Sequence, residues 1–315
     1  MTSPKGGATR MGPVLVGYTA TDAGDDAATL GARLAAATSA DLELAVVLPA
    51  DDRSVITPPD AGYDQYLRQQ ADTWLGRAEE RVREAFHGRD RDAGGPHRHV
   101  RYDESFAAGL VAAGHETGAS HIVVGAANGG IRGRHRLGSV ANELLHSSDL
   151  PVVLAPEGAR RTDPGAGITR ITAAVGTRPG ADALLEHAVA LAAATGAELR
   201  LLSLVTVDLP PSVDTGVIRL AGAAHAEEVL DTARRALPDG IDAEAVVGTG
   251  DSIEDAVSHI GWEPGEIALV GSSRLAQPRR LFLGSTAAKM LHELPVPMIV
   301  VPRTRARQPQ EGERR

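Results

Sequence analysis

One segment of this chain occurs twice, and this repetition constrains the fold more than any other feature. The first copy runs from Ile122 to Pro156 and the second from Ile267 to Pro302. Six residues of the first copy recur 146 positions later. Matched residues at one spacing identify an internal repeat, so we expect two domains of the same fold. The pairs are Gly125 and Gly271, Gly138 and Gly284, Ser139 and Ser285, His146 and His292, Pro151 and Pro297, and Pro156 and Pro302.

Each copy has the pattern strand, loop, helix, strand. Residues 122–124 and 267–270 are apolar and are followed by glycine, as buried parallel strands often are. Each loop begins at that glycine, which lets the backbone approach a ligand closely. Ser139 and Ser285 follow a glycine and precede a helical pattern, so we expect each to be the N-cap of its helix. A helix N-terminus offers unpaired N–H groups and the positive end of a dipole, so both loops suit a phosphate.

Strand and helix patterns alternate along the rest of both halves. Alternation of this kind predicts an α/β protein whose parallel strands are covered by helices on both faces. Five expected strands in each half indicate two tandem domains, at residues 12–156 and 168–302, each a flavodoxin-like or Rossmann-like sandwich. The polar segment 157–167, rich in Gly and Pro, is typical of a linker between domains.

The first half is longer than the second. Matching residues are 157 positions apart at Leu34 and Leu191, but 146 positions apart in the repeated segment. The first half therefore holds an insertion of about eleven residues, around 51–66. Its Pro-Pro step and acidic residues predict a loop, which is either a plain surface insertion or a lid over a ligand site. Long amphipathic helices are expected near 66–86 and 217–237.

The glycine loops resemble the signature of the universal stress protein family, which is Gly, two residues, Gly, nine residues, Gly and then Ser or Thr. In the first half Gly125, Gly138 and Ser139 match this signature, and Asn128 replaces the middle glycine. Asn tolerates the left-handed backbone conformation better than Arg does, so the first loop is expected to keep its shape. The second half matches at Gly271, Gly284 and Ser285, with Arg274 at the middle position.

The resemblance implies two adenine nucleotide alpha hydrolase-like domains, each with a five-stranded parallel sheet flanked by helices. In nucleotide-binding members of the family, the loop holds the phosphates and ribose of ATP. The implied ligand is ATP or another adenine nucleotide, and a requirement for Mg²⁺ is left open. Arginines crowd the first loop, where they either contact phosphate or form a solvated basic surface. The implied binding residues are Thr19, Gly125, Asn128, Gly130, Arg132, Gly138, Ser139 and Val140.

The second half is expected to be degenerate as a nucleotide site. Nucleotide-binding members of the family carry an Asp just after the first strand. Thr19 stands there in the first half and Gly176 in the second, so the second half has no side chain at this position. The implied positions of the second site are Gly176, Gly271, Arg274, Gly284, Ser285 and Thr286.

Composition argues against several classes of partner. A formal net charge of −9 and an aromatic content of 3% are atypical of nucleic-acid binding proteins. The chain has no cysteine, which excludes disulfides and thiolate metal sites. Residues 1–12 lack the apolar core of a signal peptide, and no apolar run reaches membrane-spanning length. We therefore expect a cytoplasmic protein without nucleic-acid or membrane partners.

The remaining polar residues do not predict catalysis. Asp25 and Asp26 are expected to form a solvated acidic pair. His97 and His99 alternate on an expected strand without a carboxylate partner set, so we expect no metal there. Ser139 has no evident base, and the Walker A pattern is absent. Weak ATP hydrolysis would need a water-positioning base, which is not evident, so we do not expect an enzyme.

Two functions are compatible with these residues. The first is a stress-response protein that binds an adenine nucleotide mainly through its first half and has a regulatory or protective role. The alternative is a nucleotide-independent module with degenerate sites that binds an unidentified protein. The closing strands, 152–155 and 298–301, are apolar and end their halves, and the resemblance implies that they pair in an intramolecular pseudo-dimer rather than leave two independent domains. A homodimer of the whole chain is left open.

Overall fold

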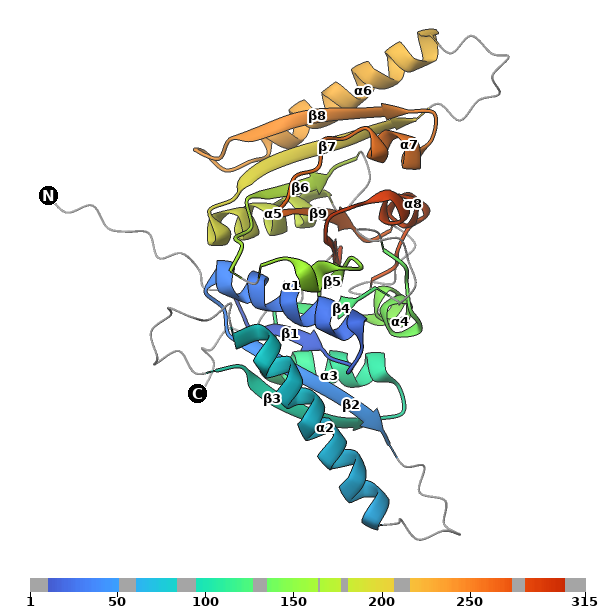
Figure 1. Ribbon diagram of the computed structural model, residues 1–315. Helices are drawn as coiled ribbons and strands as arrows, with labels where there is room; N and C mark the ends of the chain where they lie inside the picture. The colour runs from blue at the N-terminus through green and yellow to red at the C-terminus, as the bar shows by residue number, and fades with distance from the viewer. Residues whose placement is uncertain are drawn as a thin grey trace, which may run out of the picture.

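The structure is a computed structural model that describes residues 11–50, 61–83, 95–126, 135–163, 165–176, 181–206, 216–273 and 281–303. Within these ranges strands and helices alternate in both halves, as the sequence predicts (Figure 1). The first half comprises β1 (Val14–Gly17), α1 (Asp22–Thr38), β2 (Leu42–Pro49), α2 (Ala61–Val82), β3 (His97–Asp103), α3 (Phe106–Thr117), β4 (His121–Gly125), α4 (Ser139–Ser147) and β5 (Val152–Ala155). The short helix η2 (Ala159–Arg161) lies in the linker. The second half comprises β6 (Arg170–Ala174), α5 (Ala181–Thr195), β7 (Glu198–Thr206), α6 (Gly216–Arg235), β8 (Ala243–Gly250), α7 (Ile253–Ser258), β9 (Glu266–Gly271), α8 (Ser285–Glu293) and β10 (Met298–Val301).

The strands form one sheet in the order β3-β2-β1-β4-β5-β10-β9-β6-β7-β8. Strands are parallel within each half. The halves meet where β5 and β10 pair antiparallel, with Val152 opposite Val300 and Leu154 opposite Met298. This pairing confirms the predicted role of the closing strands. The two halves therefore form a pseudo-dimer with an approximate twofold relation, and not two independent domains.

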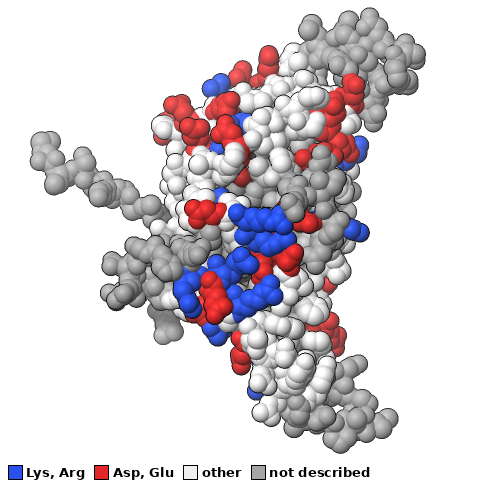
Figure 2. Space-filling model, in the orientation of Figure 1, with Lys and Arg blue, Asp and Glu red and all other residues white. Residues whose placement is uncertain are grey.

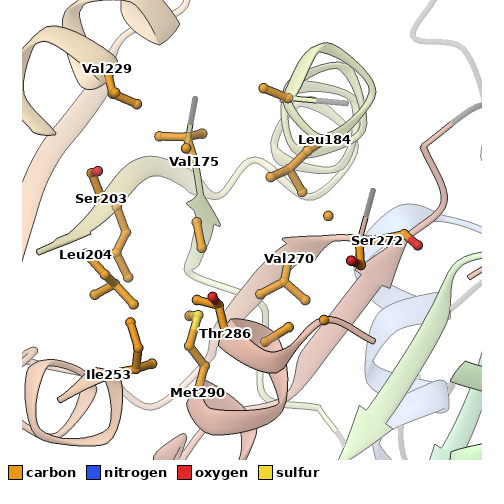
Figure 3. Close-up of a pocket in the computed structure, with 18 of the residues that line it drawn as sticks. Val175, Leu184, Ser203, Leu204, Val229, Ile253, Val270, Ser272, Thr286 and Met290 are labelled. Atoms are coloured by element: carbon orange, nitrogen blue, oxygen red, sulfur yellow. The ribbon is translucent and has the colours of Figure 1, made fainter. Parts of the chain in front are cut away.

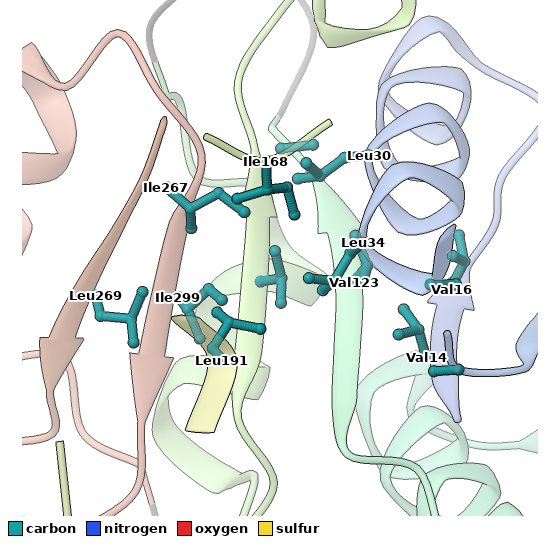
Figure 4. Close-up of a cluster of buried hydrophobic side chains, with 14 of the residues drawn as sticks. Val14, Val16, Leu30, Leu34, Val123, Ile168, Leu191, Ile267, Leu269 and Ile299 are labelled. Atoms are coloured by element: carbon teal, nitrogen blue, oxygen red, sulfur yellow. The ribbon is translucent and has the colours of Figure 1, made fainter. Parts of the chain in front are cut away.

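Helices cover both faces of the sheet in the same way in each half. Helices α1, α2, α5 and α6 contribute to the apolar core on one face, and α3, α4, α7 and α8 to the core on the other. The first core is continuous across the boundary, because Leu34 of α1 and Leu191 of α5 belong to the same buried cluster as Ile299 of β10 (Figure 4). Burial on both faces explains why the central strands are continuous apolar runs in the sequence.

The acidic pair in α1 is buried, so the prediction of a solvated pair is wrong. Asp25 and Asp26 are each 1% exposed. Asp25 accepts hydrogen bonds from Arg77 at 2.6 Å and Arg81 at 3.2 Å, and Asp26 accepts one from the Arg160 guanidinium at 2.8 Å. Figure 2 shows basic and acidic side chains gathered over α1, α2 and η2 on this face. The arginines lie 52 to 134 residues away from the aspartates in the sequence, so the local pattern could not reveal these pairs.

The linker is held against α1 by hydrogen bonds to its backbone. The carboxylate of Asp26 accepts the N–H of Arg160 at 2.7 Å. The guanidinium of Arg33 donates to the carbonyl oxygens of Ala166 at 3.0 Å and Gly167 at 3.2 Å. Because both ends of the linker are bonded to one helix, the linker helps to set the position of the second half.

The histidines of β3 have a carboxylate partner, which the sequence analysis missed. His97 Nδ1 lies 3.0 Å from one oxygen of Glu43, and His99 Nε2 lies 2.6 Å from the other. Glu43 lies opposite His97 in the sheet, so the strand register creates this cluster. Burial raises the pKa of Glu43, but the hydrogen bonds from His97 and His99 outweigh burial and lower it overall. The part of the chain that the structure describes contains no group of three or more His, Asp or Glu residues suited to a metal ion.

The boundaries of α2 differ from the predicted ones. This helix begins at Ala61, five residues before the predicted start, so it includes the end of the insertion. Residues 51–60, on which the predicted lid mainly falls, lie outside the described residues. None of the described helices is long and apolar enough to cross a membrane.

Candidate functional site

Two cavities lie at equivalent places in the halves, at the carboxyl ends of neighbouring strands. The first cavity, of about 240 Å³, lies where β1 and β4 end, and the second, of about 320 Å³, lies where β6 and β9 end. Strand order reverses between these neighbours, since each half has its first strand beside its fourth. Ligands of open α/β sheets bind at this point. The loop glycines matched to the signature lie here, Gly125 and Gly138 at the first cavity and Gly271 and Gly284 at the second.

The first cavity is bordered by β1, β4 and the start of α4. Thr19 and Gly125 line it at the strand ends, and Gly138, Ser139 and Val140 line it at the helix. The hydroxyl of Thr19 lies 3.0 Å from that of Thr21, so it already has a hydrogen-bond partner. At Gly125 a Cβ would lie 1.9 Å from the carbonyl oxygen of Ala23, because the first turn of α1 closes over this glycine. The glycine is therefore required for the contact between β4 and α1.

The second cavity is more open at the matching positions. Gly176 and Gly271 line it, and a Cβ at either glycine would meet no atom of the described residues within 4 Å. Three side chains with hydroxyl groups line this cavity, Ser203 on β7, Ser272 just after β9 and Thr286 on α8 (Figure 3). The missing side chain at Gly176 thus leaves space rather than a blocked site.

Helices α4 and α8 begin at the cavities without a side-chain cap. The structure places Gly138 and Gly284 at the N-cap, and Ser139 and Ser285 are the first helical residues. The prediction that these serines are N-caps is therefore wrong by one position. Neither glycine can supply a side-chain oxygen, and no cap hydrogen bond forms. The N–H groups of each first turn therefore lack the side-chain acceptor that usually occupies them.

The structure brings together most of the predicted site residues that it describes. Ser285 is the exception, because it begins α8 without being one of the cavity-lining residues. Asn128, Gly130, Arg132 and Arg274 lie outside the described residues. The predicted residues that line a cavity are Thr19, Gly125, Gly138, Ser139 and Val140 at the first, and Gly176, Gly271, Gly284 and Thr286 at the second.

Sequence reasoning missed several lining residues that lie on other elements. Tyr18 and Phe106 line the first cavity, and Ser203, His225 and Ser272 line the second. Tyr18 and Ser272 are each next to a predicted residue, so adjacency was an available signal. The other three come from β7, α6 and the start of α3, which approach the cavities only after the sheet has formed.

The described lining is almost free of titratable groups. Among these residues there is no Lys, Arg, Asp or Glu, and the titratable ones are Tyr18 and His225. The hydroxyl of Tyr18 donates to Asp25 at 2.8 Å. Burial, followed by this hydrogen bond, raises the pKa of Tyr18 well above its usual range. Tyr18 therefore stays protonated at neutral pH and cannot act as a base there.

His135 connects the first loop to the other half of the protein. It lies three residues before Gly138, is buried, and its Nε2–H donates to the carbonyl oxygen of Val296 at 2.8 Å. Burial lowers the pKa of His135 to about 4, although the hydrogen bond to Val296 opposes this shift. The imidazole is therefore neutral in the folded protein at neutral pH.

This burial predicts a loss of stability in mild acid. Between pH 6.5 and about 4 the unfolded chain binds a proton at His135 that the folded protein does not. The free energy of unfolding should therefore fall as the pH falls through this window, by at most about 1.4 kcal/mol per pH unit from this group. His135→Gln keeps an N–H donor but does not titrate, so urea unfolding at several pH values should show a smaller loss for the variant. Equal pH dependence in both proteins would contradict the assignment.

Comparison with known proteins identifies relatives over nearly the whole chain. The family model described as universal stress protein family matches residues 11–156 and 167–302. A universal stress protein of Mycobacterium tuberculosis is 30% identical over 304 residues, which cover 92% of this chain and 99% of the relative. A crystal structure of a universal stress protein from Archaeoglobus fulgidus aligns with a TM-score of 0.58 and 18% identity, covering 94% of this chain and 100% of that one. A universal stress protein in complex with cAMP aligns with 48% of this chain at 23% identity and a TM-score of 0.36.

Proposed function

Because this chain belongs to the universal stress protein family, we propose that it is a stress-response protein that binds an adenine nucleotide in its two cavities. One observation carries the proposal: in each half, an uncapped helix N-terminus and a glycine border a cavity at the point where strand order reverses. N–H groups at a helix N-terminus suit phosphate oxygens. The family resemblance supplies the adenine nucleotide as the ligand class.

The described residues fit such a ligand. Backbone N–H groups of the first turns of α4 and α8 would hold the phosphates, because Gly138 and Gly284 leave these turns uncapped. The base and sugar would occupy the apolar remainder of each cavity, which includes Val47 and Leu110 in the first half and Leu184 and Leu204 in the second. The described lining contributes no carboxylate to a Mg²⁺ ion, so such an ion would be held by the nucleotide phosphates.

We propose a regulatory or protective binding role and not an enzymatic one. Activation of Ser139 or of a water molecule needs a base within hydrogen-bond reach. In the first cavity the described lining offers the protonated Tyr18 and no carboxylate or imidazole. The second cavity has His225, on α6, whose described carboxylate neighbour Glu228 lies 4.0 Å away, beyond hydrogen-bond reach, and does not line the cavity.

Both halves are proposed to bind. The sequence predicts the first half as the main site, and this stays a prediction. The larger volume of the second cavity and the open space at Gly176 and Gly271 support a second working site.

Substitution of the N-cap glycines separates the two sites. The backbone of Gly138 (φ −82°, ψ 171°) and of Gly284 (φ −71°, ψ 161°) is extended, so valine can adopt it without backbone strain. At Gly284 the new Cβ would lie 3.2 Å from the Cβ of Ser273, which also lines the second cavity, so valine would fill space at the N-terminus of α8. We expect Gly138→Val to weaken binding at the first cavity by about tenfold or more, and Gly284→Val to do the same at the second.

The experiment begins with denaturation of freshly purified protein and mass spectrometry of any released nucleotide. ATP, ADP, AMP and cAMP are then titrated calorimetrically into the native protein and both variants, each variant serving as the control for the other. Loss of one binding event per variant supports the proposal. No released nucleotide and no heat at millimolar ligand would reject it in favour of a nucleotide-independent module that binds a protein partner.

A further inference from the structure

The segment just before each N-cap glycine is bound to the opposite half of the protein. In the first half this is His135, whose imidazole donates to the carbonyl oxygen of Val296. In the second half it is Leu281, whose N–H donates to the carbonyl oxygen of Ser148 at 2.7 Å. His135 and Leu281 are 146 positions apart, so the pseudo-twofold relation places them at equivalent points. The halves therefore exchange contacts beside both cavities.

A chain of contacts leads from the second cavity to α4. Ser272 lines that cavity, and its hydroxyl accepts the N–H of Phe282 at 2.8 Å. The Phe282 ring meets the ring of His146 edge-on, with centroids 5.0 Å apart. The N–H of Leu283, next in the chain, donates to the carbonyl oxygen of Leu145 at 3.2 Å. The last turn of α4 thus contacts Phe282 and Leu283, which come after the cavity-lining residue Ser272 in the sequence.

Helix α4 extends from these contacts at its C-terminal end to the first cavity at its N-terminal end. It has nine residues, or about 13 Å, and its first residues, Ser139 and Val140, line that cavity. Its C-terminal carbonyls would be unpaired without a partner, and the second half supplies donors for two of the carbonyls at this end. Every contact in this chain is made by described residues.

A second chain of contacts runs in the other direction. His135, near the first cavity, donates to Val296, which follows α8. The N–H of Leu294 donates to the carbonyl oxygen of Met290 at 3.0 Å, and Met290 lines the second cavity. The second cavity is therefore connected to the C-terminal end of α4, which begins at the first cavity. The first cavity is likewise connected to the C-terminal end of α8, which begins at the second.

We infer that Phe282, His146 and His135 are positioning residues that couple the two cavities, so that a nucleotide in one raises the affinity of the other. This inference rests on the proposed function. A ligand that holds Ser272 and the start of α8 also holds Phe282 against α4. The second nucleotide then binds beside a helix whose end is already ordered. Its binding therefore loses less conformational entropy, and its affinity is higher. Coupling of this kind is typically fivefold or more.

The test compares ATP titrations of the full chain. Gly284→Val reports the first site alone, and Gly138→Val reports the second site alone. The two curves predict how independent sites would bind, and we expect the native protein to bind more steeply, with the second ATP bound at least about fivefold more tightly. Phe282→Ala and His146→Ala should return the curve to the independent form. Neither side chain lines a cavity, so the affinity of each separate site should change little.

Two further variants separate positioning from general destabilisation. Phe282→Tyr keeps the ring against His146 and should restore the coupling. Tyr102→Ala removes an aromatic ring that contacts Arg68 and lies on β3, away from both chains of contacts, so it should leave the coupling unchanged. In the Gly284→Val background, Phe282→Ala should change first-site affinity by less than about twofold, because Phe282 does not line the first cavity.

The outcomes distinguish this inference from the proposed function. Native binding that equals the sum of two independent sites, or binding at one cavity alone, overturns the coupling and leaves nucleotide binding in place. Coupling that survives in both Phe282→Ala and His146→Ala overturns the assignment of these residues. Absence of ATP binding in every protein overturns the proposed function and the coupling together.

Discussion

Replacing Gly125 with alanine is expected to destabilise the protein by about 3 kcal/mol, the upper end of the range for overpacking. The new Cβ would lie 1.9 Å from the carbonyl oxygen of Ala23 and 2.6 Å from its carbon. Both are backbone atoms in the first turn of α1, so the helix itself must move. Urea unfolding followed by far-UV circular dichroism measures the loss.

Gly271→Ala is the matched control, because the repeat puts the same residue at the same place in the second half. A Cβ there would lie more than 4 Å from every atom beyond its chain neighbours in the part of the chain that the structure describes. We expect its free energy of unfolding to stay within about 0.5 kcal/mol of the native value. Similar losses in the two variants would show that α1 does not close over Gly125.

Glu266→Ala is expected to cost about 3–5 kcal/mol, because it leaves a buried charge without its partner. Glu266 and Arg200 are 1% and 3% exposed, and they form an ion pair inside the sheet of the second half. Glu266 also accepts a hydrogen bond from Thr172. The guanidinium of Arg200 would retain the Thr172 hydroxyl at 3.0 Å, the carbonyl oxygen of Gly261 at 3.1 Å and the ring of Trp262, but no anion among these contacts.

Glu116→Ala provides the comparison with a surface pair. Glu116 pairs with Arg101, and their side chains are 56% and 31% exposed. Water replaces such a partner readily, so a loss below about 1 kcal/mol is expected. Denaturant unfolding of both variants measures the difference, and equal losses would contradict the account of Glu266 as a buried anion. Glu266→Gln, which keeps the size but not the charge, should fall between the two.

The repeat accounts for most of what could be predicted about the fold. The alternation of apolar runs with helical patterns predicted five strands in each half, and the matched glycines predicted a phosphate-binding loop in each. The pairing of β5 with β10 was implied by the family resemblance, since the apolar closing strands end their halves. The other features depend on local patterns and on their order along the chain.

Predictions about individual polar residues were less successful. Asp25, Asp26 and His97 looked solvated or unpartnered because their partners are distant in sequence. The N-caps were misplaced by one residue, since Gly138 and Ser139 are both acceptable at that position. Hydrophobic periodicity carries no information about such choices.

The sequence by itself determined the α/β class, the tandem repeat, the parallel strands and the two positions where a ligand could bind, because periodicity and glycine spacing are properties of the chain. Tertiary structure alone decided which carboxylates are buried and which glycine is enclosed by α1. It also decided that each loop segment is bonded to the opposite half. The physical reason is that burial and hydrogen bonding depend on groups that meet across strands and halves, and two copies of one pattern can therefore have different surroundings, as Gly125 and Gly271 do.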